Sequence, residues 1–165
     1  DAKPNNAHIG LAKLEKMGKL KAVVTQNIDN LHQMAGSKTV YELHGTLYRN
    51  YCVKCHKQFD IDYIMNSEGI PHCDKCGGIV RPDVVLYEEG LDDTTVYNAV
   101  NAIRKADVLI VGGTSLNVYP AAGLIDYYRG NKLVLINKST TPYDRRANLI
   151  IRENIGQVFK EVLDL

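Results

Sequence analysis

The four cysteines of the chain fall into two pairs with identical internal spacing. Two residues separate the thiols within each pair, and seventeen residues separate the pairs. This spacing is typical of four thiolates that bind one tetrahedral zinc ion, and such an ion has no open position for water or substrate. We therefore predict one structural zinc ion with the ligands Cys52, Cys55, Cys73 and Cys76. Two disulfides or free thiols are the alternative.

Polar and small residues also follow several short apolar segments, at the points where strands are expected to end. In chain order they are Gln26, Asn27, Asp29, His44, Gly113, Thr114, Ser115 and Asn137. In parallel sheets, ligands bind beyond the carboxyl ends of the strands, and a glycine-rich turn there offers N–H groups to phosphate or ribose oxygens. The pattern predicts a nucleotide along the strand ends with His44 as a base. Each cluster alone also fits an ordinary loop or cap.

The composition narrows the classes of protein that the chain can represent. Its 165 residues, of which 45% are apolar, are typical of a globular protein with one main domain and room for a small module. A net charge of +1 argues against a nucleic-acid binder that neutralises phosphates. The sequence has neither a membrane-spanning apolar stretch nor an apolar signal segment, so we expect a cytoplasmic protein without a membrane partner. The chain lacks an initiating Met, and we expect it to begin within a longer protein.

Apolar periodicity predicts the elements that must position these residues. Helical spacing predicts helices over residues 5–17, residues 96–103, the residues after Pro120 and residues 155–163. Short aliphatic runs predict strands at residues 22–24, 40–43, 84–87, 108–111, 133–136 and 149–151. Because continuous aliphatic strands alternate with helices, we predict an α/β fold with a parallel sheet covered on both faces.

One stretch interrupts this alternation of strands and helices. Between residues 48 and 82 the aliphatic residues give way to Cys, His, Lys, Asp and Gly. We therefore predict that residues 48–82 form an inserted zinc-binding module. Residues 1–47 and 83–165 would form the main domain.

Six motifs occur along the chain in a characteristic order. They are Thr25-Gln26-Asn27-Ile28-Asp29, Glu42-Leu43-His44-Gly45, the two cysteine pairs, Arg81-Pro82-Asp83-Val84-Val85, Gly113-Thr114-Ser115-Leu116 and Ile136-Asn137. Together they resemble the sirtuin family of NAD-dependent protein deacylases, over essentially the whole chain. The resemblance implies a Rossmann-like, NAD-binding main domain and a small zinc-ribbon module. NAD and an acyl-lysine peptide would meet in the cleft between them.

The resemblance also implies a reaction and roles for individual residues. The acyl group would pass from lysine to ADP-ribose with release of nicotinamide, and His44 would be the general base. Asn27 would share a catalytic role. The residues implied to bind NAD are Gln26, Asn27, Ile28, Asp29, Gly113, Thr114, Ser115, Asn137 and Ile155.

The segment after the cysteine module is implied to bind the substrate. Val84, Val85, Leu86 and Tyr87 would pair with the backbone of the acyl-lysine peptide as an added strand. Directly afterwards the sequence departs from the family pattern of an aromatic residue, Gly and Glu, because Glu88 replaces the glycine. A side chain there disfavours a positive φ, which puts peptide binding at this point in question.

A second departure concerns the amino-terminal end. In family members the Gly-Ala-Gly loop that binds pyrophosphate lies upstream of the helix at Pro4, and the 165 residues do not contain it. The predicted sheet is therefore incomplete at its amino-terminal end, and the activity of these residues alone is left open.

Two alternative functions use the same features. The NAD chemistry would also serve a sirtuin-type protein ADP-ribosyltransferase. A catalytically silent, zinc-stabilised interaction module is the other alternative. The sequence predicts neither the natural substrate protein, nor the acyl-chain preference, nor the oligomeric state.

Overall fold

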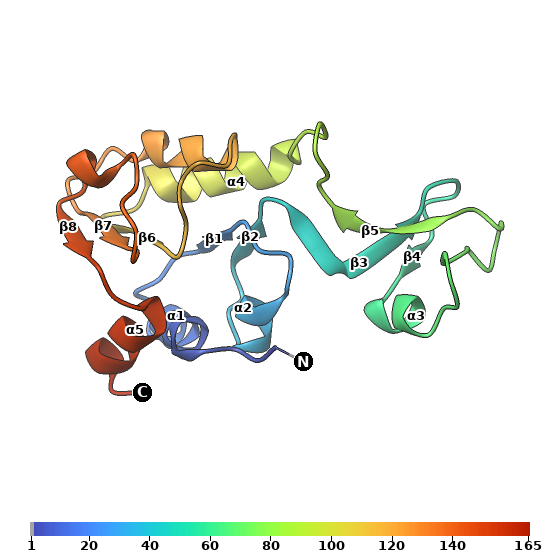
Figure 1. The fold of residues 1–165 in the computed structure, drawn as a ribbon, viewed down its shortest axis with the longest axis horizontal. Coiled ribbons are helices and arrows are strands. Elements are labelled where there is room, and N and C mark those ends of the chain that lie inside the picture. The colour runs from blue at the N-terminus through green and yellow to red at the C-terminus, as the bar shows by residue number, and fades with distance from the viewer. Residues whose placement is uncertain (1) are drawn as a thin grey trace. The chain divides into compact units, whose positions relative to one another are not determined.

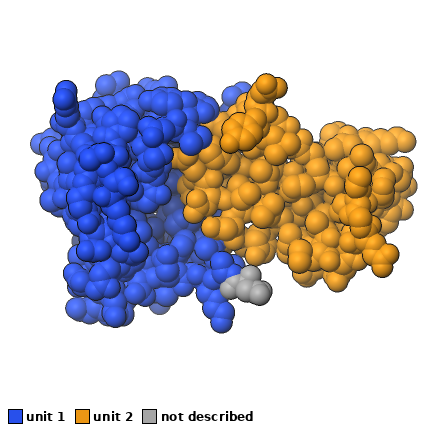
Figure 2. Space-filling model, viewed as in Figure 1, with its two compact units in different colours: residues 1–24, 31–41, 92–165 blue, residues 25–30, 42–91 orange. Residues whose placement is uncertain are grey.

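The structure is a computed structural model, and it describes residues 2–165. The chain forms two compact units (Figure 2). Unit 1 comprises residues 2–24, Leu31–Tyr41 and Asp92–Leu165, and unit 2 comprises Thr25–Asn30 and Glu42–Leu91. Unit 2 therefore includes both the cysteine module and the segments that carry His44 and Val84. The predicted zinc-binding module, residues 48–82, is shorter than unit 2 and lies entirely within it.

The centre of unit 1 is a parallel sheet of three strands in the order β6-β7-β8. The strands are β6 (Leu109–Gly112), β7 (Leu133–Ile136) and β8 (Leu149–Ile151). Gly112 pairs with Ile136, and Ile136 pairs with Ile151, so the three carboxyl ends are level. The predicted parallel sheet is confirmed for these three strands, and the residues that follow them share one edge. The strands predicted at residues 22–24 and 40–43 do not join it and form a separate sheet.

Helices cover both faces of this sheet (Figure 1), as the predicted Rossmann-like α/β fold requires. Helix α1 (Asn6–Lys16) packs beside α5 (Ile155–Leu163) over a core that contains Ile136 and Phe159. On the opposite face lie α4 (Asp93–Arg104) and the 3-10 helix η1 (Ala121–Tyr127). The helix predicted after Pro120 is thus a 3-10 helix. Among residues 2–165, no helix combines the length and apolar character needed to cross a membrane.

A second, two-stranded sheet contains β1 (Val23–Thr25) and β2 (Val40–Glu42), with the short helix α2 (Leu31–Met34) between them in the chain. The N–H group of Val23 donates to the carbonyl oxygen of Thr39 at 2.9 Å. Both predicted strands are confirmed within one residue at their ends. Thr25, the last residue of β1, and residues 26–30 belong to unit 2.

Unit 2 is built on an antiparallel sheet in the order β4-β3-β5. Its strands are β3 (Gly45–Cys52), β4 (Gln58–Phe59) and β5 (Val80–Val84), and α3 (Ile61–Met65) follows β4. Strand β3 pairs with β5 from Cys52 opposite Val80 to Gly45 opposite Val84, with a bulge between Thr46 and Asn50. The same strand therefore joins the first cysteine pair to the residue after His44.

The prediction of a strand over residues 84–87 is wrong. Strand β5 ends at Val84, and the chain turns at residues 86–89. The N–H group of Leu86 donates to a carboxylate oxygen of Glu89 at 2.9 Å, and the N–H group of Glu89 donates to the carbonyl oxygen of Leu86 at 3.1 Å. These two hydrogen bonds close a turn. The strand is predicted from the apolar residues at 84–87, which give no sign of this turn.

Gly45 is the glycine on which the β3–β5 pairing depends. Its φ is +74°, and a Cβ at this position would lie 1.9 Å from the backbone carbonyl oxygen of Asp83. Because backbone cannot swing aside as a side-chain tip can, we expect Gly45→Ala to lower the free energy of unfolding by roughly 2–4 kcal/mol. Urea denaturation of the wild type and the variant measures this loss. Gly69→Ala, whose added Cβ would meet no atom within 4 Å, should cost less, and an equal loss in both would contradict the explanation by backbone clash.

Candidate functional site

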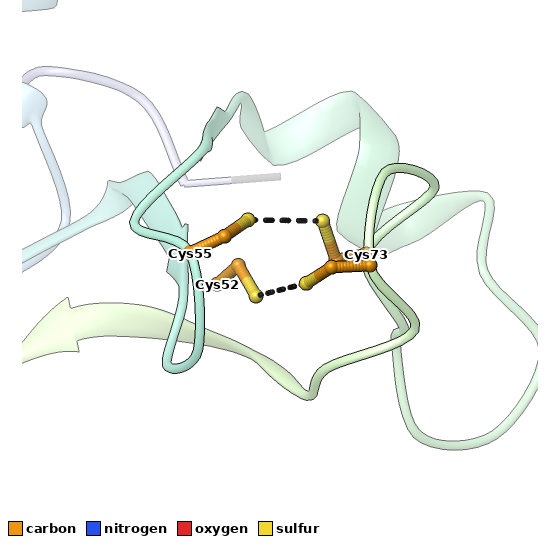
Figure 3. A group of neighbouring side chains, drawn as sticks. Cys52, Cys55 and Cys73 are labelled. Atoms are coloured by element: carbon orange, nitrogen blue, oxygen red, sulfur yellow. Dashed lines mark hydrogen bonds between the residues drawn. The ribbon is translucent and has the colours of Figure 1, made fainter.

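The four cysteine thiols of unit 2 converge in space. The Sγ atoms of Cys55 and Cys73 are 3.6 Å apart, and those of Cys52 and Cys76 are 3.5 Å apart. All four Sγ atoms lie within 4.8 Å of one another, and Figure 3 shows the thiol of Cys55 facing that of Cys73. A disulfide would bring two sulfurs to about 2.05 Å. Four sulfurs around zinc at about 2.3 Å lie about 3.8 Å from one another, so the thiols fit this ion.

The backbone makes the same kind of turn at each of the two cysteine pairs. The residue directly after each pair has a left-handed conformation, with φ of +57° at His56 and +69° at Gly77. Each of these residues donates its N–H group to the carbonyl oxygen of the first cysteine of its pair, at 2.9 Å and 2.8 Å. A Cβ at Gly78 would lie 2.9 Å from the Sγ atom of Cys52, so the second turn requires a glycine there. Both turns thus point their thiols at one centre.

The pKa values of the thiols differ across the cluster. Burial raises the pKa of Cys52, but N–H groups of Cys55 and Lys54 and the neighbouring thiols outweigh it, so that the pKa falls to about 6. The Gly78 N–H group lowers the pKa of Cys76, but the other thiols and burial raise it to about 12. Without a metal, therefore, one thiolate forms first and opposes ionisation of the rest. A cation that binds all four thiolates removes this repulsion.

His44 has its ring fixed by the segment that follows β1. Its Nδ1 atom lies 3.0 Å from the backbone carbonyl oxygen of Gln26. A carbonyl oxygen accepts hydrogen bonds only, so Nδ1 carries the proton and Nε2 of the neutral ring keeps its lone pair. The His44 residue is half-buried, and its own carbonyl oxygen accepts the N–H group of Val85 at 3.0 Å. The structure thus fixes the orientation of the imidazole through Nδ1 and leaves Nε2 outside this hydrogen bond.

Residues 25–30 are joined to the His44 segment at regular intervals. The N–H groups of Leu43 and Leu47 donate to the carbonyl oxygens of Thr25 and Ile28, at 2.9 Å and 3.1 Å. These bonds flank the contact between His44 and Gln26. The structure therefore brings the predicted residues Gln26, Asn27, Ile28 and Asp29 together with His44 in unit 2. Asn27 is the exposed member of this group, and the other three are half-buried.

The remaining predicted cofactor residues gather in unit 1, at the carboxyl edge of the parallel sheet. Gly113 follows β6 with φ of +65° and donates its N–H group to the carbonyl oxygen of Ile136 at 3.1 Å. Asn137 follows β7, and Ile155 begins α5, where its side chain fills the space over Gly112. A Cβ at Gly113 itself would meet no atom within 4 Å, so the backbone is open to a ligand there. Thr114 and Ser115 continue the same turn.

The predicted substrate residues lie at the end of β5 and in the turn that follows it. Leu86 and Tyr87 are exposed, whereas Val84 and Val85 are half-buried. Arg81 holds this turn, because its guanidinium donates to both carboxylate oxygens of Glu89, at 2.8 Å and 3.1 Å. The Arg81 guanidinium and the Leu86 N–H group lower the pKa of Glu89 to about 2. This carboxylate therefore stabilises the turn above its ordinary pKa, and the contribution is lost as the pH falls through about 2.

Glu88 has a positive φ, although its side chain is expected to disfavour one. It adopts a positive φ of +71°, so the left-handed conformation is retained although the residue is not glycine. The turn has the positive φ at its third residue that type II turns require, and Gly or Asn is usual there. Glutamate adopts it because the Arg81–Glu89 ion pair and the two turn hydrogen bonds hold the neighbouring backbone.

Sequence reasoning missed two parts of this arrangement. The ion pair between Arg81 and Glu89 spans eight residues and has no periodic signature. The orientation of His44 depends on a backbone carbonyl group, which every residue type supplies. A groove of about 510 Å³ between α1 and residues 35–38, which follow α2, is lined by none of the predicted site residues.

The chain is similar in sequence to a known protein family and to proteins of assigned activity. The Sir2 family model matches residues 1–120. The chain is 67% identical over 164 residues to an NAD-dependent protein deacetylase of Clostridium acetobutylicum, and the match covers 99% of this chain and 67% of that protein.

Solved structures are similar to the chain as well. A Sir2 complex with a p53 peptide and NAD⁺ has a TM-score of 0.92 and 43% identity, with 99% of this chain and 70% of that chain covered. A Sir2 complex with the inhibitor EX-527, 2'-O-acetyl-ADP-ribose and a deacetylated p53 peptide has a TM-score of 0.92 and 42% identity, with 99% and 72% covered.

Proposed function

The chain belongs to the Sir2 family, and from this premise we propose that it is an NAD-dependent protein-lysine deacylase. The acyl group passes from lysine to ADP-ribose, and nicotinamide is released. The relative of 67% identity is named a deacetylase, and similar structures contain NAD⁺, a p53 peptide and 2'-O-acetyl-ADP-ribose. The observation that carries the proposal is the His44 imidazole, whose Nδ1 proton is held by the Gln26 carbonyl oxygen.

His44 is the proposed general base of the reaction. In the neutral ring, the Nε2 lone pair of His44 would accept the proton of a ribose hydroxyl of bound NAD and so activate that oxygen toward the acyl-derived carbon. The Gln26 carbonyl oxygen remains bonded to Nδ1 and stabilises the imidazolium that results. Asn27 is the proposed second catalytic residue, since it lies next to Gln26 and its side chain is exposed.

We propose that the two groups of polar residues bind the two halves of NAD. When bound, NAD supplies the ADP-ribosyl acceptor and nicotinamide as the leaving group. We assign the nicotinamide and its ribose to unit 2, to the group Gln26, Asn27, Ile28 and Asp29. We assign the adenosine half to unit 1, to the group Gly113, Thr114, Ser115, Asn137 and Ile155. The open backbone at Gly113 supports the second assignment.

The substrate peptide is assigned to the end of β5. Strand β5 is an edge of its three-stranded sheet, so an extended peptide can add to it by backbone hydrogen bonds. Val84, Val85, Leu86 and Tyr87 are the proposed contacts. Binding through backbone groups explains how one site accepts a lysine within many sequences.

Zinc is assigned a structural role at Cys52, Cys55, Cys73 and Cys76, because four thiolates complete its coordination. Two Cys-x2-Cys pairs that bind a metal ion instead of forming disulfides are typical of a reducing compartment. We therefore include a cytoplasmic location in the proposal. Fractionation of cells with an antibody against the protein tests it, and recovery outside the cytoplasm would exclude it.

The deacylase activity is tested with an acetyl-lysine peptide, NAD and zinc-loaded protein. We expect one nicotinamide to be released for each acetyl group removed, as quantified by chromatography and mass spectrometry. Omission of NAD should abolish both products, because the acyl acceptor is then missing. Transfer of ADP-ribose to a protein without acyl loss would favour the ADP-ribosyltransferase alternative. Absence of both products would contradict the proposed function.

A further inference from the structure

The turn after β5 contains a carboxylate in an unusual backbone position. Glu88 is the third residue of the turn closed between Leu86 and Glu89, and its φ is +71°. Glycine takes this conformation without steric cost, whereas a residue with a Cβ does not. A glutamate at this point therefore carries a conformational energy cost that glycine would not. Residues with such a cost are frequent at functional sites.

The folded chain does not use the charge of Glu88. Its neighbour Glu89 binds Arg81 through both carboxylate oxygens and also accepts the N–H group of Leu86. Glu88 forms no hydrogen bond or ion pair with any other of the described residues 2–165, and it is exposed. Of the two adjacent acids, one fixes the turn and the other points its charge at solvent.

The charge of Glu88 is not balanced by nearby cations in the chain. Within unit 2, residues 82–91 include three acidic residues, Asp83, Glu88 and Glu89, and no Lys or Arg, although the whole chain has a net charge of +1. Within unit 2, Asp83 is paired with Arg49, and Glu89 is paired with Arg81. Glu88 therefore remains the unneutralised carboxylate of the turn, and it generates a local negative potential.

The position of Glu88 places this potential beside an edge that can receive a peptide. Strand β5 pairs with β3 on one side only, and the turn begins two residues after its end. Tyr87 is fully exposed and Leu86 is exposed by 57%. A peptide that adds to β5 can cover these apolar side chains, and its flanking residues then pass the Glu88 carboxylate.

We propose that Glu88 is a specificity-determining residue that favours acyl-lysine segments with basic residues beside the acyl-lysine. The inference rests on the proposed function and names its substrate class. Lys or Arg next to the acyl-lysine gains an ion pair with Glu88, whereas Asp or Glu is repelled. The backbone contacts of β5 do not depend on sequence, so the charge adds selectivity to a site that otherwise has little.

The test uses three acetyl-lysine peptides that differ only in the residues on both sides of the acetyl-lysine, which are Arg, Gln or Glu. Exposed ion pairs change binding by roughly two- to fivefold, so exchange of attraction for repulsion should change kcat/KM by roughly five- to tenfold. We expect the wild type to prefer the Arg peptide over the Glu peptide by that factor at low salt. High salt should reduce the preference, because it screens exposed charges.

Three variants separate charge from backbone. Glu88→Gln and Glu88→Gly should both bring the ratio of Arg to Glu peptide close to one, and Glu88→Lys should invert it. Glu88→Gly also removes the backbone conflict, so loss of selectivity in this variant cannot come from a damaged turn. Glu68→Gln removes another exposed carboxylate of unit 2 and should leave the ratio unchanged.

The outcomes distinguish this inference from the proposed function. If the wild type deacylates all three peptides equally, or if Glu88→Gln keeps the preference, the role of Glu88 is overturned while the deacylase activity stands. If the wild type deacylates none of them, including the neutral peptide, the proposed function itself fails.

Discussion

Replacement of His44 by alanine is expected to lower kcat for deacylation by about 10²–10⁴-fold, the usual contribution of a positioned general base. The physical reason is the loss of the Nε2 lone pair that the Gln26 carbonyl group orients through Nδ1. Steady-state kinetics with an acetyl-lysine peptide at saturating NAD measures the effect. Release of nicotinamide without loss of the acyl group would show that the variant fails at the step that needs the base.

Two further variants make the His44 result specific. His56→Asn removes an exposed imidazole of unit 2 at a left-handed position that asparagine tolerates, and its kcat should match the wild type. Gln26→Ala removes a side chain but keeps the carbonyl oxygen that binds His44, so its kcat should fall much less than that of His44→Ala. Full activity of His44→Ala would remove this residue from the mechanism.

The strands of the parallel sheet could be predicted from the sequence because each is a short aliphatic run. The runs at Leu133–Ile136 and Leu149–Ile151 are short and aliphatic, and both strands have the predicted bounds. Strand β7 is buried along most of its length, and such a strand needs apolar side chains at every position, so its limits are visible in composition. Strand β8 is more exposed, but its aliphatic run has the same limits. The cysteine spacing is similarly informative, because the coordination of one ion constrains the turns around it.

Unit 2 is less predictable for the opposite reason. Strand β3 contains Thr46, Arg49 and Asn50, and its partner β5 lies about thirty residues later in the chain. Pairing with a distant strand by backbone hydrogen bonds leaves little trace in side-chain type. The strand predicted over residues 84–87 fails for a related reason, since the Arg81–Glu89 ion pair ends it at Val84.

Part of the candidate site could be predicted from residue types, whereas another part depends on backbone conformation and could not. The motifs identify His44, the glycine-rich turn and the four thiols by residue type. They do not reveal that a backbone carbonyl group orients the imidazole, nor that Glu88 takes a positive φ. Both features depend on contacts with residues that are not adjacent in the sequence.

Replacement of Cys52 by alanine is expected to abolish zinc binding and to unfold unit 2 in its present form. Cys52 is fully buried, and it packs with Cys73 and Val80 in the small core of the module. Structural zinc contributes about 10–16 kcal/mol of apparent binding free energy in zinc-finger peptides. This is comparable to the whole folding free energy of a typical domain, about 5–15 kcal/mol. Metal analysis should fall from one zinc per chain to none, and amide exchange in unit 2 should become rapid.

The same substitution should also abolish deacylation, although Cys52 is not assigned to the reaction. Strand β3 begins directly after His44 and ends at Cys52, and its pairing with β5 spans both points. Loss of the metal therefore disorders the strand that fixes the base and the edge that receives the peptide. Val53→Ala, which shortens an exposed side chain in the same turn, should retain zinc and activity. A zinc-free Cys52→Ala protein with unchanged kcat would show that His44 is held independently of the metal.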